Sequence, residues 1–485
     1  MITRHARPLF AALLIIAFLF TAATPHSAAS ARSYTVKAAN GKHAKNTGKS
    51  KKKKRRRRRR PVGPRLYAGA PLKILSKKTS VLARGATYTL ETVSRNKWRV
   101  GIVHAHLNEG YAVNLYKAKD KAVGFERVED LVHRLDSAQS LQAIAAVNAN
   151  YWRAGIGTVL GAAVCDGEVI GFDNIKQWAR LMIRRDGSFA IGPDSLAATV
   201  TTPRGTLAIK SVNDRHTDSG IVLYNHFFGP TVPPVDSSNK ALDSAMRRMS
   251  QDTNEIFYET DEDIYVVPDS LIQKPRSEEH TLKCMAVAID TPRVNTPFRC
   301  RVSAMTSKMV PVLRRGIALT FPRADSTLYH TMHTGDTISV LFQAGDGTGG
   351  DIEDMLMAGP RLVRNGRVSV ETDAENFHRK SFINGGHART AIGFSKDQEE
   401  VILVTVDRPA GTRKAGRPGI DLRDLARILV AEGAYDAMNF DGGSSTTLVV
   451  NGQTVVPDTG KDFSRHVASA IAITRSRKPT VGYSR

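Results

Sequence analysis

Two aspartates in the C-terminal part of the chain follow directly on apolar stretches. Residues 401–406 lead to Asp407, and residues 437–440 lead to Asp441. Carboxylates of this kind serve as general acids, general bases or nucleophiles. A helix between two strands of one sheet usually makes these strands parallel, and binding crevices form outside the carboxyl ends of strands. We therefore expect both aspartates at one edge of a sheet, joined there by Asn148 from an earlier strand.

The turn after Asp441 is built from small residues with hydrogen-bond donors: Gly442, Gly443, Ser444 and Ser445. Glycine lets a backbone approach a ligand without interference from a Cβ atom. Amides and hydroxyls in such a turn donate hydrogen bonds to phosphate or sugar oxygens. The alternative interpretation is an ordinary glycine-containing hairpin that leads into the next strand.

A second polar cluster spans residues 384–390 and contains His387, Arg389 and Thr390. An arginine that ends a glycine-rich loop and enters a strand is well placed to hold a phosphate bidentately. Arg465, in a polar loop before an apolar strand, is a second candidate for this role, and a plain surface arginine is its alternative. His387 is either a general acid or base, or an ordinary surface histidine.

Several familiar motifs are missing from the sequence. There is no Gly-x-Ser-x-Gly elbow, no phosphate-binding loop ending in Gly-Lys-Ser/Thr, and no Gly-x-Gly-x-x-Gly after a strand. Their absence counts against a lipase-like serine hydrolase and against nucleotide binding. No Cys/His spacing resembles a zinc site, so we assign no metal ligands. The sequence requires no cofactor and leaves dependence on a divalent metal open.

Periodicity gives the elements that position these residues. Residues 88–103 alternate as antiparallel strands do, residues 126–135 show helical spacing, and residues 205–345 are β-rich. Between the two aspartates, Asp421 is a natural N-cap for a helix that ends near Gly433. We predict an α+β (mixed α/β) fold: mixed sheets with a C-terminal strand–helix–strand unit and a β-rich middle segment.

The positive charge of the 485-residue chain is concentrated at its N-terminus. Residues 1–65 hold 18 of the 70 Lys and Arg and no Asp or Glu, which leaves 52 basic against 46 acidic residues, a net +6 of the total +24. The high pI of the chain therefore reflects the N-terminal 65 residues, and it does not identify residues 66–485 as a nucleic-acid binder. We expect no specific nucleic-acid partner.

Three segments are predicted along the chain. Residues 1–30 resemble a secretory signal peptide, with an uncleaved signal anchor as the alternative. Residues 31–65 form a basic arm that is expected to be disordered, and it serves either as a tether to anionic envelope polymers or as a solvated spacer. Residues 66–485 form the catalytic domain. The protein is thus expected to be exported, to the periplasm or the extracellular space.

Export affects how the three cysteines are interpreted. Cys284 and Cys300 flank a strand–turn–strand pattern, so a disulfide across a hairpin and three buried free thiols are both open. Cys165 is left unpaired within the monomer in either case.

Six blocks of sequence, taken in order, resemble the phosphodiester glycosidase family. The similarity runs from about residue 100 to 475 and is dense only at 140–170 and 355–475. The blocks are residues 145–152, 359–366, 389–393, 406–408, 433–445 and 465–468, which include Ala-Ala-Val-Asn-Ala-Asn-Tyr-Trp and Asn-Phe-Asp-Gly-Gly-Ser-Ser.

The resemblance implies hydrolysis of a sugar-1-phosphodiester, such as an N-acetylglucosamine-1-phosphodiester, to free sugar and a phosphomonoester. The site residues it implies are Asn148, Asn150, Arg389, Thr390, Asp407, Asn439, Asp441, Ser445 and Arg465. The chain departs from the family pattern at Ser444, where a third glycine is usual, and in residues 148–152, where Asn-Gly-Gly-Phe-Phe is common. These departures put the sugar accepted in doubt.

We therefore predict an exported glycosidase whose partner is a phosphodiester-linked glycan. Asp441 would stabilise the oxocarbenium-like centre or activate water, with Asp407 as its partner carboxylate. Two alternatives stay open: a non-catalytic module that binds envelope glycans in the same groove, and a phosphodiesterase or phosphatase that acts on the phosphorus side.

Overall fold

The computed structural model describes residues 73–475, with gaps at 94–97, 140, 154–156, 173–176, 194, 215–219, 233–255, 260–263, 268–280, 324–325, 346–349, 408–418 and 457–463. The chain divides into Met1–Ala68 and Gly69–Arg485, and the structure concerns the second unit. The expected signal peptide and basic arm lie outside the described residues.

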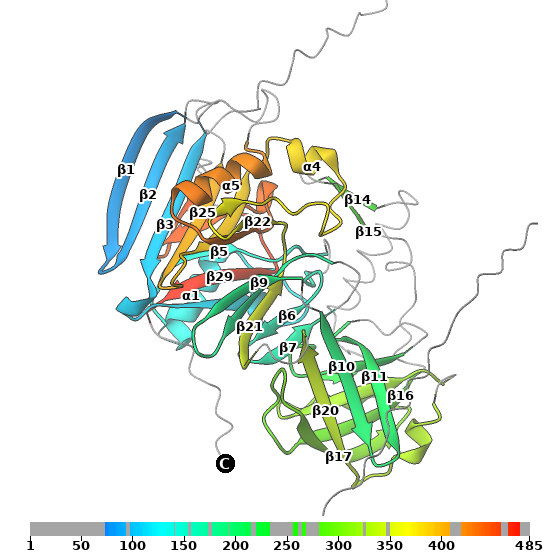
Figure 1. Ribbon diagram of the computed structural model, residues 1–485. Helices are drawn as coiled ribbons and strands as arrows, with labels where there is room; N and C mark the ends of the chain where they lie inside the picture. Colours follow the sequence, from blue (N-terminus) through cyan, green and yellow to red (C-terminus); the bar gives the residue numbers. More distant parts are fainter. Residues whose placement is uncertain are drawn as a thin grey trace, which may run out of the picture. The chain divides into compact units, whose positions relative to one another are not determined.

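The largest part of the described fold outside the barrel is an eight-stranded sheet (Figure 1). Asp407 ends one of its strands, and Asp441 follows another by two residues. Every neighbouring pair of strands in this sheet is antiparallel. Its strands, in spatial order, are β1 (Ile74–Ala83), β2 (Ala86–Val93), β3 (Arg99–His106), β25 (Glu400–Asp407), β24 (Arg389–Phe394), β26 (Asp436–Asn439), β22 (Arg361–Arg364) and β23 (Arg367–Val368).

A five-stranded sheet packs against this one through a shared apolar core that includes Ile102, Leu403 and Leu448. Its order is β28 (Gln453–Val456), β27 (Leu448–Val450), β5 (Ala143–Asn148), β29 (Ser469–Thr474) and β4 (Ala112–Lys117). Helix α1 (Val128–Gln139) buries Val128, Leu131, Val132 and Leu135 in a second core with residues of this sheet. The helical spacing in the sequence is thereby explained by one apolar face.

The β-rich middle segment forms a closed seven-stranded barrel. Its strands are β10 (Leu196–Thr202), β11 (Gly205–Val212), β12 (Ile221–Tyr224), β19 (Gly316–Phe321), β16 (Leu282–Ala288), β17 (Phe298–Thr306) and β20 (Thr337–Ala344). In sequence the barrel is inserted within another five-stranded sheet: β7 (Glu168–Gly171), β6 (Ala163–Cys165), β21 (Ile352–Met357), β8 (Arg180–Arg184) and β9 (Phe189–Gly192). Apolar side chains from both form one core.

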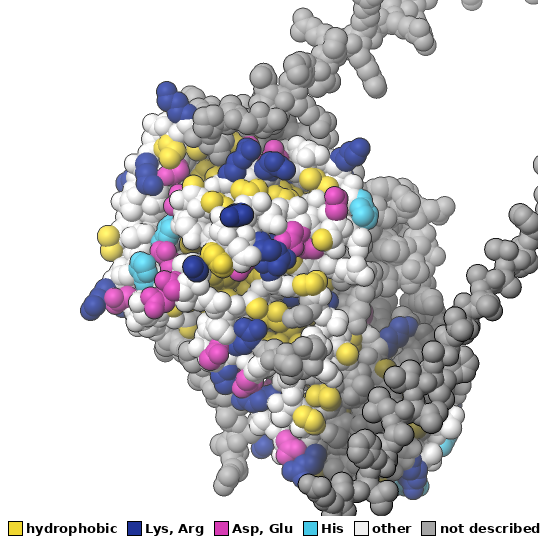
Figure 2. Space-filling model, in the orientation of Figure 1, with side chains coloured by type: hydrophobic (Ala, Val, Ile, Leu, Met, Phe, Trp, Pro, Cys, Tyr) yellow, Lys and Arg dark blue, Asp and Glu magenta, His cyan; other side chains and the backbone are white. Residues whose placement is uncertain are grey.

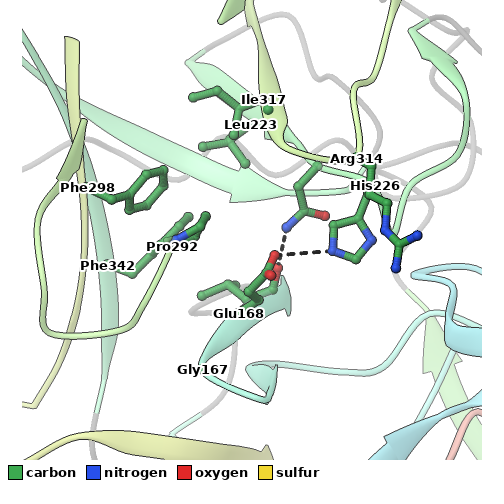
Figure 3. A pocket seen from close by; sticks show the side chains of 12 residues that line it. Gly167, Glu168, Leu223, His226, Pro292, Phe298, Arg314, Ile317 and Phe342 are labelled. Atoms are coloured by element: carbon green, nitrogen blue, oxygen red, sulfur yellow. Dashed lines mark hydrogen bonds and ion pairs between the residues drawn. The ribbon is translucent and has the colours of Figure 1, made fainter. Parts of the chain in front are cut away.

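A small pocket lies where β7 meets the barrel (Figure 3). Glu168 and His226 lie 3.2 Å apart on one side of it, and Phe298 and Phe342 lie on the other. The volume of the cavity is about 10 Å³, which is room for one water molecule. The pocket is therefore a packing contact between β7 and the barrel.

The expected α+β fold is wrong, because strands dominate the described residues. Their α-helices are α1, α4 (Lys380–Asn384) and α5 (Leu422–Ala431). Short elements complete this part of the chain: the paired strands β13 (Thr231–Val232) and β18 (Val310–Pro311), the pair β14 (Ile256–Glu259) and β15 (Ile264–Val267), and the 3-10 turns η1 (Leu107–Glu109), η2 (Ala118–Asp120), η5 (Tyr329–Thr331) and η6 (Gly443–Ser445).

The expected strand–helix–strand unit is present, but its strands are not neighbours. Strand β24 pairs with both β25 and β26 in antiparallel fashion, so these two run in the same direction on either side of it. Helix α5 begins as predicted, with the Asp421 carboxylate accepting a hydrogen bond from the Asp424 amide at 2.8 Å. Asp407 and the Asp441 that follows β26 are consequently at the same edge of the sheet, as expected.

The three cysteines are free and buried. In the β16–β17 register, Cys284 lies opposite Met305, and Cys300 lies opposite Ala288. The two residues are therefore not a cross-strand pair, and of the two open possibilities the structure shows free thiols. Burial raises the pKa of both thiols to about 12, so they stay protonated at neutral pH.

Charges of both signs are present on the face of the molecule shown in Figure 2. On the face shown in Figure 2, Lys and Arg side chains are interspersed with Asp and Glu. This mixture agrees with the small net charge outside the N-terminal segment. None of the helices among the described residues has the length and apolar character needed to cross a membrane.

Candidate active site

The strand register assigns the site residues of the large sheet to its two faces. Thr390 lies opposite Thr405, and Asp407 follows two residues later, so alternation places Thr390 and Asp407 on the same face. Gly101 also lies opposite Thr405, and a Cβ atom there would meet the Leu448 side chain of β27 at 2.9 Å. This face is therefore the one that packs against the second sheet, and we call it the inner face.

Asn148, at the end of β5, ties the second sheet to the inner face. Its Oδ1 accepts hydrogen bonds from Thr390 Oγ1 at 2.8 Å and from the Thr447 amide at 3.0 Å. Its Nδ2 donates to the main-chain oxygen of Asp441 at 2.6 Å. The Asp441 amide in turn donates to the Ala149 carbonyl at 3.0 Å. Both sides of the Asp441 main chain are thus fixed by the end of β5.

The Asp441 carboxylate is held by two N–H groups. The Gly442 amide donates to Oδ1 at 2.9 Å, and the Trp152 indole Nε1 donates to Oδ2 at 3.1 Å. The residue keeps 8% of its surface exposed. Hydrogen bonds to a carboxylate stabilise its negative charge and fix its orientation. Asp441 is therefore a carboxylate that two donors hold in one orientation.

A cationic side chain lies beside this anion. The Arg465 guanidinium stacks on the Trp152 ring, 4.9 Å from its centre, and Nη1 donates to Ser444 Oγ at 2.6 Å. The edge of Phe125 supports the Trp152 ring from another side at 5.0 Å. Arg465 and Trp152 are only partly buried. The arrangement presents one positive and one negative group around a single indole ring.

The amides of the glycine turn are used within the protein. Gly442 donates to Asp441, and the Gly443 amide donates to the Ala388 carbonyl at 2.8 Å. A Cβ atom at Gly442 would meet that carbonyl oxygen at 2.7 Å, which explains the need for glycine. Ser445 is buried, and Ser444 contacts Arg465. Contacts within the protein therefore hold this turn in place. The expectation that its amides bind a ligand stays a prediction.

Arg389 projects from the opposite, outer face of the sheet. It lies opposite Val406, one residue out of phase with Thr390. Its side chain is fully buried, donates to the carbonyls of Phe382 at 2.5 Å and Ile420 at 3.3 Å, and lies 4.8 Å from the centre of the Phe382 ring. Arg389 therefore anchors α4 and the segment before α5, and its role as a phosphate clamp stays a prediction.

Asn439 and Asn150 are buried and hold the framework together. Asn439 Nδ2 donates to the Tyr151 hydroxyl at 2.8 Å and to the Gly359 carbonyl at 2.9 Å. Asn150 Nδ2 donates to the Met357 carbonyl at 3.1 Å. Buried amides that make such bonds stabilise the loops they join. Both residues support the site from behind.

Three stacked aromatic rings lie behind Arg389. The Trp178 and Phe377 rings are 4.8 Å apart at 13°, and the Phe377 and Phe382 rings are 5.3 Å apart at 16°. Tyr151 packs edge-on against Trp178 at 5.1 Å. Phe382 joins this stack to Arg389, because its ring also contacts the guanidinium. The outer face therefore packs against a largely apolar cluster.

His387 is buried rather than a surface residue. Its Nε2 lies 2.9 Å from the Ser381 carbonyl, and its main chain pairs with Ile420. A ring nitrogen facing a carbonyl carries the proton and donates. These contacts assign His387 a structural task. Of the two alternatives, the surface histidine is wrong, and a role as general acid or base stays a prediction.

Trp152 belongs to the candidate site by its contacts, although the sequence did not point to it. In the sequence it is only the last residue of the block 145–152, whereas in the structure it donates a hydrogen bond to Asp441 and stacks on Arg465. The available signal was its place in the same block as Asn148 and Asn150. Among the described residues, no group of three or more His, Cys, Asp or Glu side chains is arranged to hold a metal ion.

Comparisons with known proteins point to one family. Residues 302–474 match the model of the phosphodiester glycosidase family. A stretch of 99 residues is 32% identical to the N-acetylglucosamine-1-phosphodiester alpha-N-acetylglucosaminidase of Bos taurus and 33% identical to that of Homo sapiens. The stretch covers 19% of this chain and 18% of each relative, so it spans less than a fifth of their length.

Solved structures support the fold over a longer range. A hypothetical protein from Synechocystis superimposes with a TM-score of 0.56 at 20% identity, over 84% of this chain and 64% of its own. A protein from Burkholderia pseudomallei gives 0.50 at 17% identity, over 78% and 74%. The family match includes all the expected site residues except Asn148 and Asn150. Residues 302–474 are therefore similar to the phosphodiester glycosidase family, as the motifs of the sequence predict.

Proposed function

We propose that this chain is an exported glycosidase that hydrolyses a sugar-1-phosphodiester to free sugar and a phosphomonoester. The observation that carries the proposal is the Asp441 carboxylate, fixed by Gly442 and Trp152 and flanked by the Arg465 guanidinium. The family match at residues 302–474 supports the reaction class. The names of the curated relatives make N-acetylglucosamine the first sugar to test.

The charges of the site suit the bond to be broken. Cleavage at the glycosidic side develops positive charge at the anomeric carbon, which a nearby carboxylate stabilises. Asp441 supplies this carboxylate, or uses it to activate water. Asp407, which projects from the same inner face as Thr390, is the partner carboxylate in this proposal.

The leaving group explains the place of Arg465. A phosphodiester departs as a stabilised anion, so neutralisation by a guanidinium matters more than protonation by a general acid. Arg465 is oriented by Ser444 Oγ and by the Trp152 ring. In this geometry the phosphate lies on the Arg465 side of the indole, and the sugar lies on the Asp441 side.

The location and partners of the enzyme belong to the same proposal. The apolar N-terminal stretch within residues 1–30 favours export, and the basic segment 31–65 favours a tether to anionic envelope polymers. The substrate would then be a phosphodiester-linked glycan of that envelope. Deleting residues 31–60 should weaken the association of the protein with envelopes in a salt-dependent way.

A panel of sugar-1-phosphodiesters tests the reaction. The wild-type chain should release free sugar and a phosphomonoester, and Asp441→Asn should lower the rate by about 10²–10⁴-fold, the range for a lost catalytic carboxylate. The thermal unfolding of the variant is the control for folding. Release of inorganic phosphate would indicate a phosphatase, and tight binding without turnover would indicate a binding module. Wild-type rates in the variant would remove Asp441 from the mechanism.

A further inference from the structure

Lys117 ends strand β4 with a side chain that is shut off from solvent, since only 2% of the residue is exposed. Its Nζ donates to the carbonyl oxygen of Gly157 at 2.9 Å and to that of Gly124 at 3.2 Å. Burial lowers the pKa of the Lys117 ammonium to about 7. A buried ammonium is costly, and an apolar side chain of the same length would avoid that cost. What Lys117 contributes must therefore come from the two segments that it joins.

The first of these segments pairs with Trp152. A β-bridge joins Trp152 to Val159. Two residues before Val159, the Gly157 amide donates to the Arg153 carbonyl at 3.0 Å. The carbonyl of this same Gly157 is the one that Lys117 holds. The ammonium is thus bonded to the segment that pairs with the main chain of Trp152.

The second segment supports the Trp152 side chain from the side. Gly124 is followed by Phe125, whose ring packs edge-on against the Trp152 ring at 5.0 Å. The next residue, Glu126, exchanges main-chain hydrogen bonds with Val467 at 2.9 and 3.0 Å. This segment therefore connects the indole to the part of the chain that follows the candidate phosphate-binding arginine.

The two segments are in direct contact. A Cβ atom at Gly157 would lie 2.4 Å from the carbonyl oxygen of Gly124, and the φ angle of Gly157 is +71°. Both facts require glycine at this position. The two carbonyl oxygens converge on a single ammonium, which offsets the repulsion between their partial negative charges. Lys117 is thus the donor that allows the segments to lie this close.

We propose that Lys117 is a positioning residue of the candidate active site. By holding the two segments together, it fixes the Trp152 indole where Nε1 reaches Asp441 Oδ2 at 3.1 Å and the ring centre lies 4.9 Å from the Arg465 guanidinium. Lys117 thus acts on Asp441 and Arg465 through Trp152, without taking part in the chemistry. The consequence for catalysis rests on the proposed function, whereas the hold on the indole does not.

NMR of the tryptophan indole N–H groups tests the hold on Trp152 in the full chain. The chain has three tryptophans, and the signal that is missing from Trp152→Phe identifies Trp152. Lys117→Met removes the donor but keeps a side chain of similar size. It should shift the Trp152 indole signal and speed its hydrogen exchange with solvent. The signal of Trp98, which is buried elsewhere in the core, should stay in place.

Lys283→Met is the matched control. Lys283 is also buried, on strand β16 of the barrel, and it donates to the carbonyls of Thr281 at 3.1 Å and Ser307 at 3.3 Å. Both variants leave two carbonyls without this donor, so both should unfold at a lower temperature than the wild type. Only Lys117→Met should move the Trp152 signal.

Kinetics on a sugar-1-phosphodiester give the second readout. Lys117→Met should lower kcat by roughly threefold to tenfold, because a loosened indole loses part of its hydrogen bond to the Asp441 carboxylate. KM should stay within about twofold of the wild-type value. Lys283→Met should leave both constants near those of the wild type.

An unmoved Trp152 signal in folded Lys117→Met would overturn the proposal, as would an equal shift in Lys283→Met or a shifted signal with wild-type kcat. If Lys117→Met does not fold, Lys117→Gln decides by the same signal, because its N–H groups end one bond nearer the main chain and cannot span both carbonyls. A moved indole in a protein whose wild type cleaves no phosphodiester would refute the proposed function alone. An active wild type with an unmoved indole in the variant would refute the positioning role alone.

Discussion

The inner and outer faces of the large sheet both carry polar residues at the same edge, but these residues have different surroundings. On the inner side, Arg465 is partly buried and Asp441 keeps 8% of its surface exposed, and the two are oriented by an indole and a serine hydroxyl. On the outer side, Arg389 and Asn439 are fully buried and donate to main-chain carbonyls and a tyrosine hydroxyl. The comparison teaches that position at a strand end does not by itself make a residue catalytic. In the proposed mechanism, the reacting residues differ from the supporting ones in the exposure of their side chains and in the groups that they contact.

Replacing Arg465 would test the inner face most strongly. Arg465→Ala should lower kcat by about 10²–10³-fold, the cost of losing one group that stabilises developing charge. The free energy of unfolding should change little, because the side chain is partly exposed. Steady-state kinetics and chemical denaturation check the two expectations. A fall in stability with unchanged kcat would move Arg465 into the supporting group.

Replacing Arg389 should have the opposite pattern of effects, a loss of stability with little change in substrate binding. Arg389→Lys cannot reproduce the fork that reaches Phe382 and Ile420, and it should lower the free energy of unfolding by about 2–3 kcal/mol. Once folded, the variant should keep KM near the wild-type value. A large rise in KM at unchanged stability would show that Arg389 does bind the phosphate, and the division between the faces would fail.

Trp152→Phe isolates a single hydrogen bond on the inner face. Phenylalanine keeps a ring beneath Arg465 but cannot donate to Asp441 Oδ2. A hydrogen bond to a charged group contributes about 1.5–3 kcal/mol, so kcat should fall by about tenfold or more while KM changes little. The matched variant Ser444→Gly, which removes the hydroxyl bound by Arg465, should have a smaller effect. Equal kcat for Trp152→Phe and wild type would show that the indole only fills space.

Glu375 gives the outer side a pH dependence of stability. Its carboxylate accepts from the amides of Arg361 at 2.7 Å and Ala179 at 2.8 Å, but burial raises its pKa from 4.5 to about 7. Because the pKa of Glu375 is higher in the folded than in the unfolded protein, protonation of this carboxyl stabilises the fold. The stabilisation is present below pH 4.5 and is lost as the pH rises through 7. The free energy of unfolding should therefore fall between pH 4.5 and 7, by roughly 2–3 kcal/mol.

Glu375→Gln should flatten this part of the profile, because glutamine does not titrate. Denaturant unfolding at several pH values measures the slope. Burial also raises the pKa of Glu353, so a residual slope of the same sign is expected in the variant. An unchanged slope would mean that Glu375 is ionised in the folded protein.

The sequence predicted part of the strand arrangement that carries the candidate site. The strand–helix–strand pattern correctly placed Asp407 and Asp441 at one edge, and the strand before Asn148 correctly brought that amide to Asp441. The sequence alone could not assign Arg389 to a face of the sheet. Side chains alternate between the two faces along β24, but the register with β25 is needed to tell which face is which. The role of Trp152 depends on a contact 289 residues away in sequence.

The errors in the fold have similar causes. Strand β24 lies between β25 and β26, and no local pattern shows such an insertion. The barrel closes through pairs that are distant in sequence, such as β10 with β20, so weak periodicity indicated strands without their arrangement.

Isotopic labelling tests the central claim most directly. The wild-type chain is given a sugar-1-phosphodiester in water enriched in oxygen-18, and both products are analysed by mass spectrometry. Attack at the anomeric carbon, stabilised by Asp441, predicts that the label enters the free sugar and that the phosphomonoester stays unlabelled. Label in the phosphomonoester would show attack at phosphorus and would contradict the account.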